Sequence, residues 1–199
     1  KWRSVLIQNT LIEQEGTKVL QGPLAGMEFI ERSAEGCHIA KLLGCYEQPL
    51  QPSIHKALSG HYTKIINIGC AEGYYAVGFA RAVPGLISLA FDTDVNAQNS
   101  CRQLAEKNGV SDRVTIGGLF SPDDFAKYEN EAALVFCDIE GAEEELLDPD
   151  LAPALRTLDI IVESHECLRP GITQKLLSRF EKTHTIELIE DNGSRQLDN

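Results

Sequence analysis

The stretch that decides the fold is residues 64–94, KIINIGCAEGYYAVGFARAVPGLISLAFDTD. It begins with an apolar run, 65–68, which favours a strand buried on both faces. A glycine turn follows and leads into a helical pattern that ends at Pro84-Gly85, and a second apolar run then ends on Asp92. Glycines let a backbone approach a ligand, a helix N-terminus offers free N–H groups, and an acid accepts ribose hydroxyls. This order of elements therefore predicts a nucleotide-like ligand at the strand ends.

The spacing of the glycines indicates which nucleotide. A dinucleotide fingerprint, G-x-G-x-x-G, would place glycine at positions 71 and 74, where this chain has Ala71 and Tyr74. The sequence N-I-G-C-A-E-G-Y instead resembles the first motif of S-adenosylmethionine-dependent methyltransferases, usually acid-x-G-x-G-x-G, with Asn67 in place of the acid and Ala71 in place of the middle glycine. The resemblance implies S-adenosylmethionine (SAM) as the cofactor. The cofactor-binding residues that it implies are Asn67, Gly69, Cys70, Ala71, Gly73 and Asp92.

Strand and helix patterns alternate through the rest of the chain. Further strands are predicted at 113–117, 132–137, 159–162 and 185–189, and helices at 95–107, from Ser121, at 141–147 and at 170–183. Such alternation predicts an α/β fold with a doubly wound, mostly parallel sheet. The resemblance makes this a Rossmann-like class I methyltransferase fold, with residues 61–199 as the SAM-binding domain.

The first 60 residues lack this alternation of strand and helix patterns, and we expect them to form a cap or lid over the strand ends. Their pattern is mixed over 2–11, with short strands at 17–20 and 26–30 and helices at 37–43 and 53–58. At the other end, nothing after Asp191 predicts the antiparallel seventh strand that usually completes a methyltransferase sheet. We expect this last strand to be missing through truncation of the chain, because an unpaired apolar edge is a liability.

A second group of residues follows the fourth predicted strand. The run Cys137-Asp138-Ile139-Glu140-Gly141-Ala142-Glu143 resembles the D-x-E-G-x-E hallmark of the FkbM family of methyltransferases. The glycine turn before it and Glu163-Ser164-His165 after the fifth strand extend the match over roughly residues 44–190. The resemblance implies transfer of a methyl group to a hydroxyl oxygen of a small molecule or carbohydrate.

Asp138, Glu163 and His165 are the candidate catalytic residues, because they follow adjacent central strands at the edge where open α/β sheets bind ligands. The hydroxyl that is methylated must lose a proton, and His165 or Asp138 could accept it as a base. Alternatively, the two carboxylates and the imidazole could hold a divalent cation, although we assign no metal ligand from the sequence. Glu47, on a proline-marked bend, resembles a lid contact to the cofactor or substrate. Glu143 is interpreted as structural, favouring the start of a helix.

The composition of the chain limits the partners, metal sites and cellular compartments that can be expected. The chain has 199 residues, enough for one domain, and a net charge of −12, which disfavours nucleic acid as a partner. No apolar run approaches the length of a membrane helix, so no membrane partner is expected. The six cysteines form no C-x-x-C pair, which indicates neither zinc nor a disulfide framework and favours the reduced cytoplasm. The oligomeric state stays open. The alternatives are a degenerate SAM-binding regulatory module and, less favoured, an NAD-dependent oxidoreductase.

Overall fold

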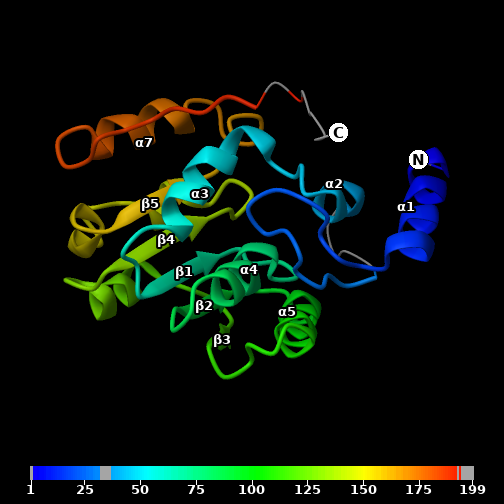
Figure 1. Cartoon of the computed structure of the whole chain (residues 1–199). Coiled ribbons are helices and arrows are strands. Elements are labelled where there is room, and N and C mark those ends of the chain that lie inside the picture. The colour runs from blue at the N-terminus through cyan, green and yellow to red at the C-terminus, as the bar shows by residue number, and fades with distance from the viewer. Residues whose placement is uncertain (1, 32–36, 192, 194–199) are drawn as a thin grey trace.

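A five-stranded parallel sheet forms the centre of the computed structural model, which describes residues 2–31, 37–191 and 193 (Figure 1). Its strand order is β3-β2-β1-β4-β5, and every neighbouring pair is parallel. The strands are β1 (Lys64–Ile68), β2 (Ile87–Phe91), β3 (Val114–Gly117), β4 (Ala133–Cys137) and β5 (Asp159–Val162). The five strands predicted between residues 65 and 162 are confirmed.

Side chains alternate along each strand between two apolar clusters, one on each face of the sheet. Ile65 and Leu134 belong to the first cluster, and their chain neighbours Ile66 and Val135 belong to the second. The first face is covered by α3 (Gln51–Leu58), α4 (Tyr74–Ala82) and α5 (Val95–Lys107). The second is covered by η2 (Pro122–Tyr128), α6 (Glu143–Leu146), η3 (Pro153–Arg156) and α7 (Ile172–Phe180). Cover on both faces confirms the doubly wound architecture.

The strand order reverses between β1 and β4, since the chain runs outward to β3 and then returns to the other side of β1. Open α/β sheets bind ligands outside the carboxyl ends of the strands at such a switch point. Here Gly69 follows β1 with a left-handed φ of 76°, and a Cβ atom at this position would collide with the carbonyl oxygen of Asp138 after β4. Glycine is required there, because the backbones that leave the two strands almost touch.

The N-terminal segment differs in part from the sequence prediction. Residues predicted as mixed form the helix α1 (Trp2–Glu15). The two predicted short strands reduce to one antiparallel bridge between Lys18 and Glu28. The predicted helix at 37–43 is α2 (His38–Leu43), and η1 (Gln48–Leu50) leads into α3. Phe29 and Leu42 share the apolar cluster that holds α4, so the segment packs directly on the sheet domain.

The predicted sixth strand at 185–189 is wrong. These residues are not in a strand, and they line the same cavity as β5. Within the described residues no strand follows β5, which is therefore the outer strand of the sheet. Residue 192 and residues 194–199 lie outside the described part, and truncation stays a prediction. The described residues include no helix with the length and apolar character to cross a bilayer.

Candidate active site

The turn after β1 adopts left-handed backbone at Gly69, Ala71 and Gly73, with φ values of 76°, 46° and 90°. This conformation is costly for alanine, which occupies the place of the expected middle glycine. Gly73 also needs to be small, because a Cβ atom there would lie 2.6 Å from the Sγ atom of Cys101. Gly73 is the N-cap of α4 and offers no side-chain cap, so the first N–H groups of the helix are available to a ligand.

Asp92 lies against this turn, as predicted. Its Oδ2 atom accepts a hydrogen bond from the backbone N–H of Ala71 at 2.9 Å, and its Oδ1 atom accepts one from the N–H of Asp94 at 2.8 Å. A carboxylate has about four lone-pair positions, so Asp92 can still accept hydrogen bonds from two ribose hydroxyls. The structure thus brings together the glycine turn, the start of α4 and the acid after β2.

The side chains of Asn67 and Cys70 lie deeper in the protein. Asn67 is 2% exposed, and its Nδ2 atom donates weakly to the carbonyl of Phe136 at 3.4 Å. Cys70 is buried, and its side-chain hydrogen bond with Cys101, together with burial, raises the pKa of its thiol. Cofactor contact through these two residues stays a prediction, and for Cys70 it would have to come from the backbone.

The structure brings Asp138, Glu163 and His165 together at the ends of β4 and β5. One ligand atom from each of them lies within 4.8 Å of the others. The side chain of His165 is only 10% exposed, and its Nε2 atom lies 3.5 Å from Oδ1 of Asp138 and 3.5 Å from Oε2 of Glu140. The three predicted catalytic residues therefore form one cluster, which we call the acid–imidazole cluster.

Glu143 holds the imidazole of this cluster. Its side chain is fully buried, and its Oε1 atom lies 2.7 Å from Nδ1 of His165. The same oxygen accepts hydrogen bonds from the N–H groups of Ile139 and Gly141 at 3.3 and 3.2 Å. Because this carboxylate acts as an acceptor, we assign the proton of the neutral ring to Nδ1, which leaves the lone pair on Nε2 facing the cluster. The sequence interpretation of Glu143 as a structural residue missed this contact, and only its place in the D-x-E-G-x-E hallmark could have indicated it.

Glu47 reaches the same region from the N-terminal segment. Its backbone is left-handed with a φ of 45°, and its Oε2 atom accepts a hydrogen bond from the hydroxyl of Tyr75 at 2.6 Å. Tyr46 stands beside it, packed edge-on against Tyr74 with ring centroids 5.6 Å apart. Burial raises the pKa of Tyr46, and the charges of Glu47, Asp138 and Glu163 raise it further, so its hydroxyl stays protonated. The sequence analysis did not identify Tyr46 or Tyr75.

The carboxylates of the site shift one another's pKa values and the pKa of the His165 imidazole. Burial raises the pKa of Glu163, and the charge of Glu47 raises it further. For His165, burial alone would lower the pKa, but the hydrogen bond that the ring donates to Glu143 and the charges of Glu143, Asp138 and Glu163 outweigh it, so the pKa is raised. The carboxylates of the cluster therefore favour the protonated, positively charged form of the His165 imidazole.

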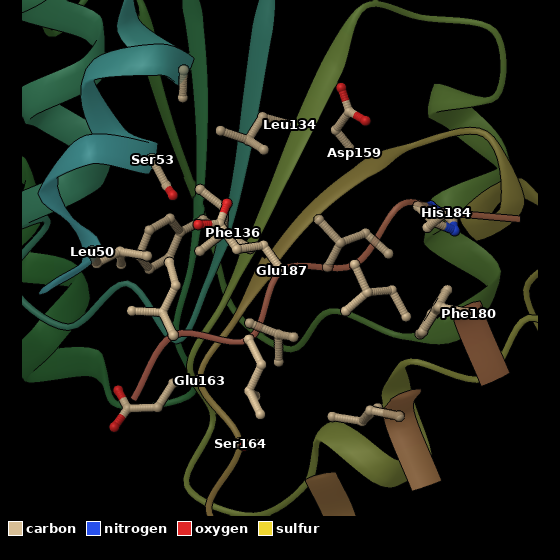
Figure 2. Close-up of a pocket in the computed structure, with 18 of the residues that line it drawn as sticks. Leu50, Ser53, Leu134, Phe136, Asp159, Glu163, Ser164, Phe180, His184 and Glu187 are labelled. Atoms are coloured by element: carbon tan, nitrogen blue, oxygen red, sulfur yellow. The ribbon is translucent and has the colours of Figure 1, made fainter. Parts of the chain in front are cut away.

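A cavity of about 540 Å³ lies beside β5 (Figure 2). Glu163 and Ser164 stand at one end of it and Asp159 at the other, while Leu50 and Ser53 come from the N-terminal segment and Phe180 from α7. Glu47 also lines it. The walls are mainly apolar and include Leu134, Phe136, Ile160, Ile161, Leu176, Leu177, Ile186 and Leu188. The cavity thus joins an apolar chamber to the carboxylate end of the site.

Comparisons with known proteins give only distant likenesses. No protein-family model matches the chain, and no curated protein matches it in sequence. A solved structure of a candidate O-methyltransferase from Klebsiella pneumoniae is 16% identical, with a TM-score of 0.48, over 89% of this chain and 82% of its own. The O-methyltransferase TomG from Streptomyces achromogenes, in complex with SAM, is 16% identical with a TM-score of 0.49 over 69% and 66%. An O-methyltransferase from Bacillus cereus, in complex with SAH, is 16% identical with a TM-score of 0.40 over 79% and 71%. Likeness at this level transfers no activity, so function is argued from the site itself.

Proposed function

We propose that this chain is a SAM-dependent methyltransferase that methylates a hydroxyl oxygen of a small molecule. The observation that carries the proposal is the contact between Gly69 and Asp138 at the switch point, which joins two half-sites. The glycine turn, the start of α4 and Asp92 form the half that suits a nucleoside. The acid–imidazole cluster forms the other half, and its Asp138 lies one residue beyond β4, the strand that pairs with β1.

The chemistry of methyl transfer fits this division. The acceptor oxygen attacks the methyl carbon of the sulfonium, the carbon–sulfur bond breaks, S-adenosylhomocysteine (SAH) leaves, and the hydroxyl proton must go elsewhere. Positioning of the two reactants supplies much of the rate, and a group that handles the proton adds roughly 10²- to 10⁴-fold. Asp138 and His165 stand where an acceptor beside the methyl group would lie, and we assign them the handling of the acceptor hydroxyl.

The cavity beside β5 supports an acceptor with an apolar body and its hydroxyl directed at Glu163. A carbohydrate, which the FkbM resemblance also implies, would place some of its hydroxyls against the aliphatic side chains of the wall, where unpaired polar groups are costly. We therefore rank phenols and aliphatic alcohols above sugars as acceptors. Membership of the FkbM family rests on the D-x-E-G-x-E run and on the sequence matches on either side of it, and it stays a proposal.

A regulatory module that binds SAM without turnover is the second candidate, favoured by Asn67 and by the strained Ala71. Such a module would have no need to keep Asp138, Glu163 and His165 in one cluster with a buried carboxylate behind the imidazole. The hypothesis of an enzyme explains the acid–imidazole cluster, and the hypothesis of a regulatory module does not.

The test is methyl transfer from isotopically labelled SAM to a panel of phenols, alcohols and sugars, with products identified by mass spectrometry. We expect labelled product from at least one acceptor, and His165→Ala should lower turnover by roughly 10²- to 10⁴-fold while SAH affinity changes little. The matched control is His55→Ala, since His55 is exposed on α3. Turnover that survives His165→Ala unchanged would remove the cluster from the reaction.

A further inference from the structure

The acid–imidazole cluster has the composition and spacing of a metal site. It offers one nitrogen and two carboxylates from Asp138, Glu163 and His165, with all three ligand atoms within 4.8 Å of one another. Two ligands of one ion at a bond length of about 2.1 Å lie roughly 3 to 4.2 Å apart. The separation of 3.5 Å between Nε2 of His165 and Oδ1 of Asp138 falls inside this range. It is longer than a typical hydrogen bond, so a metal ion could lie between the two atoms.

The imidazole is prepared for a ligand on its inner side. Its ring is nine-tenths buried, its Nδ1 atom is held by Glu143, and its Nε2 atom faces Asp138. Histidines that bind metals almost always donate their other ring N–H to a carboxylate or carbonyl, which fixes the tautomer and increases ligand basicity. Glu143, whose carboxylate is fully buried and contacts Nδ1 of His165, gives the ring this kind of support. The other contacts of the Glu143 carboxylate are the backbone N–H groups of Ile139 and Gly141, which hold it in place behind the ring.

The charge of the site needs a cation. Carboxylates of Asp138, Glu140 and Glu143 lie within 3.5 Å of the His165 ring nitrogens, and Glu163 belongs to the same cluster. Several carboxylates close together in a partly buried site repel one another strongly. One divalent ion between Asp138 and Glu163 would offset this repulsion.

We propose that Asp138, Glu163 and His165 bind a divalent transition-metal ion, with Glu143 as the residue that positions the imidazole. The ligand set favours Mn²⁺ or Zn²⁺ over Mg²⁺ and Ca²⁺, which prefer oxygen alone. If the proposed function holds, the ion binds the acceptor hydroxyl and lowers its pKa, so that the proton leaves to solvent and the oxygen attacks the methyl carbon.

Calorimetric titration of chelator-treated protein with Mn²⁺ tests the site without any acceptor or SAM. The variants are Glu163→Gln, Asp138→Asn and His165→Gln, with Glu106→Gln and His55→Gln as matched controls on exposed helix positions. We expect one Mn²⁺ per chain and a loss of affinity of more than about 10-fold in each of the three variants, with the controls unchanged. Glu143→Gln, which keeps the ligands, should weaken binding by roughly 10- to 100-fold.

Glu163→Gln is the decisive variant, because Glu163 is exposed and its amide analogue preserves the fold, as thermal melting can verify. The proposal is overturned if the parent protein binds neither Mn²⁺ nor Zn²⁺, if Glu163→Gln binds as tightly as the controls, or if Mg²⁺ binds more tightly than both. SAH affinity measured on the same chelator-treated protein separates the two proposals. Loss of SAH binding contradicts the proposed function, and loss of Mn²⁺ binding contradicts only the metal site.

Discussion

At the scale of single residues, Asp92 is the side chain on which cofactor binding depends most. Its carboxylate already accepts from Ala71 and Asp94, and we expect it to accept from the ribose as well. A hydrogen bond to a charged group contributes about 1.5–3 kcal/mol, so Asp92→Ala should weaken SAH binding by roughly 10- to 100-fold. Isothermal titration calorimetry measures this directly. Asp94→Ala is the control, since Asp94 caps α5 and is exposed; equal affinity in the Asp92 variant and the parent would exclude Asp92 from the site.

The residue scale also shows what the sequence could predict. The position of Asp92, Asp138 and Glu163 at one edge of the sheet could be predicted because each directly follows a strand, and His165 lies three residues after β5. Glu143 could not, because its burial depends on the loop after β5 folding back to place His165 beside it, 22 residues away in the chain. Tyr46 and Tyr75 were missed for the same reason, since aromatic residues near Glu47 carry no periodic signal.

At the scale of elements, η2 offers a test of pH dependence. Asp124 closes a capping box with Ser121 at the start of η2. The hydrogen bond from Lys127 lowers the pKa of Asp124 to about 2, helped by the N–H and hydroxyl of Ser121. An unfolded aspartate titrates near 3.9, so the unfolded chain binds more protons between these values. The stability that Asp124 contributes is therefore fully present above about pH 4 and is lost as the pH falls toward 2.

The measurement is the melting temperature of the parent and of Asp124→Asn between pH 6 and pH 2. The gap between them should be constant down to about pH 4 and should close by about pH 2. Asp123→Asn, one residue earlier in the same element, is the matched control. A gap that stays constant to pH 2 would show that the Asp124 carboxylate charge contributes nothing.

The outer strand β5 offers a second test at this scale. The N–H of Glu163 donates to the carbonyl of Cys137 on β4, so by alternation the N–H of Ile161 also points to β4, and those of Ile160 and Val162 point outward. We expect the amides of Ile160 and Val162 to exchange with deuterium on the order of 100-fold faster than that of Ile161. Nuclear magnetic resonance resolves the three amides. Equal protection would mean that another strand, or a second copy of the chain, pairs with this edge.

The elements show where pattern reasoning fails. The strands in the middle of the sheet were predicted because apolar runs buried on both faces are unambiguous there. Residues 185–189 have the composition of a strand, but pairing is a tertiary property, and these residues line a cavity and are not in a strand. The predicted helix from Ser121 was correct in its capping signal, yet it forms as 3₁₀ turns in η2, which capping residues do not distinguish from an α-helix.

At the scale of the whole molecule, two apolar clusters on opposite faces of one parallel sheet hold the ends of β1, β2, β4 and β5 at a common edge. The N-terminal segment shares the first cluster and carries Glu47 to that edge. The arrangement of the sheet thus gathers residues from positions 47 to 165 of the chain into one site. The doubly wound class followed from the alternation of patterns in the sequence, whereas the way the first 58 residues pack did not.

The central claim is that the glycine turn and Asp92 bind SAM rather than a dinucleotide. Titration of the parent chain with SAH and with NAD⁺ by calorimetry under identical conditions tests it most directly. We predict one SAH site per chain, with an affinity more than about 10-fold higher than that for NAD⁺, because Ala71 and Tyr74 replace two glycines of the dinucleotide fingerprint. Tighter binding of NAD⁺ than of SAH would contradict the methyltransferase assignment.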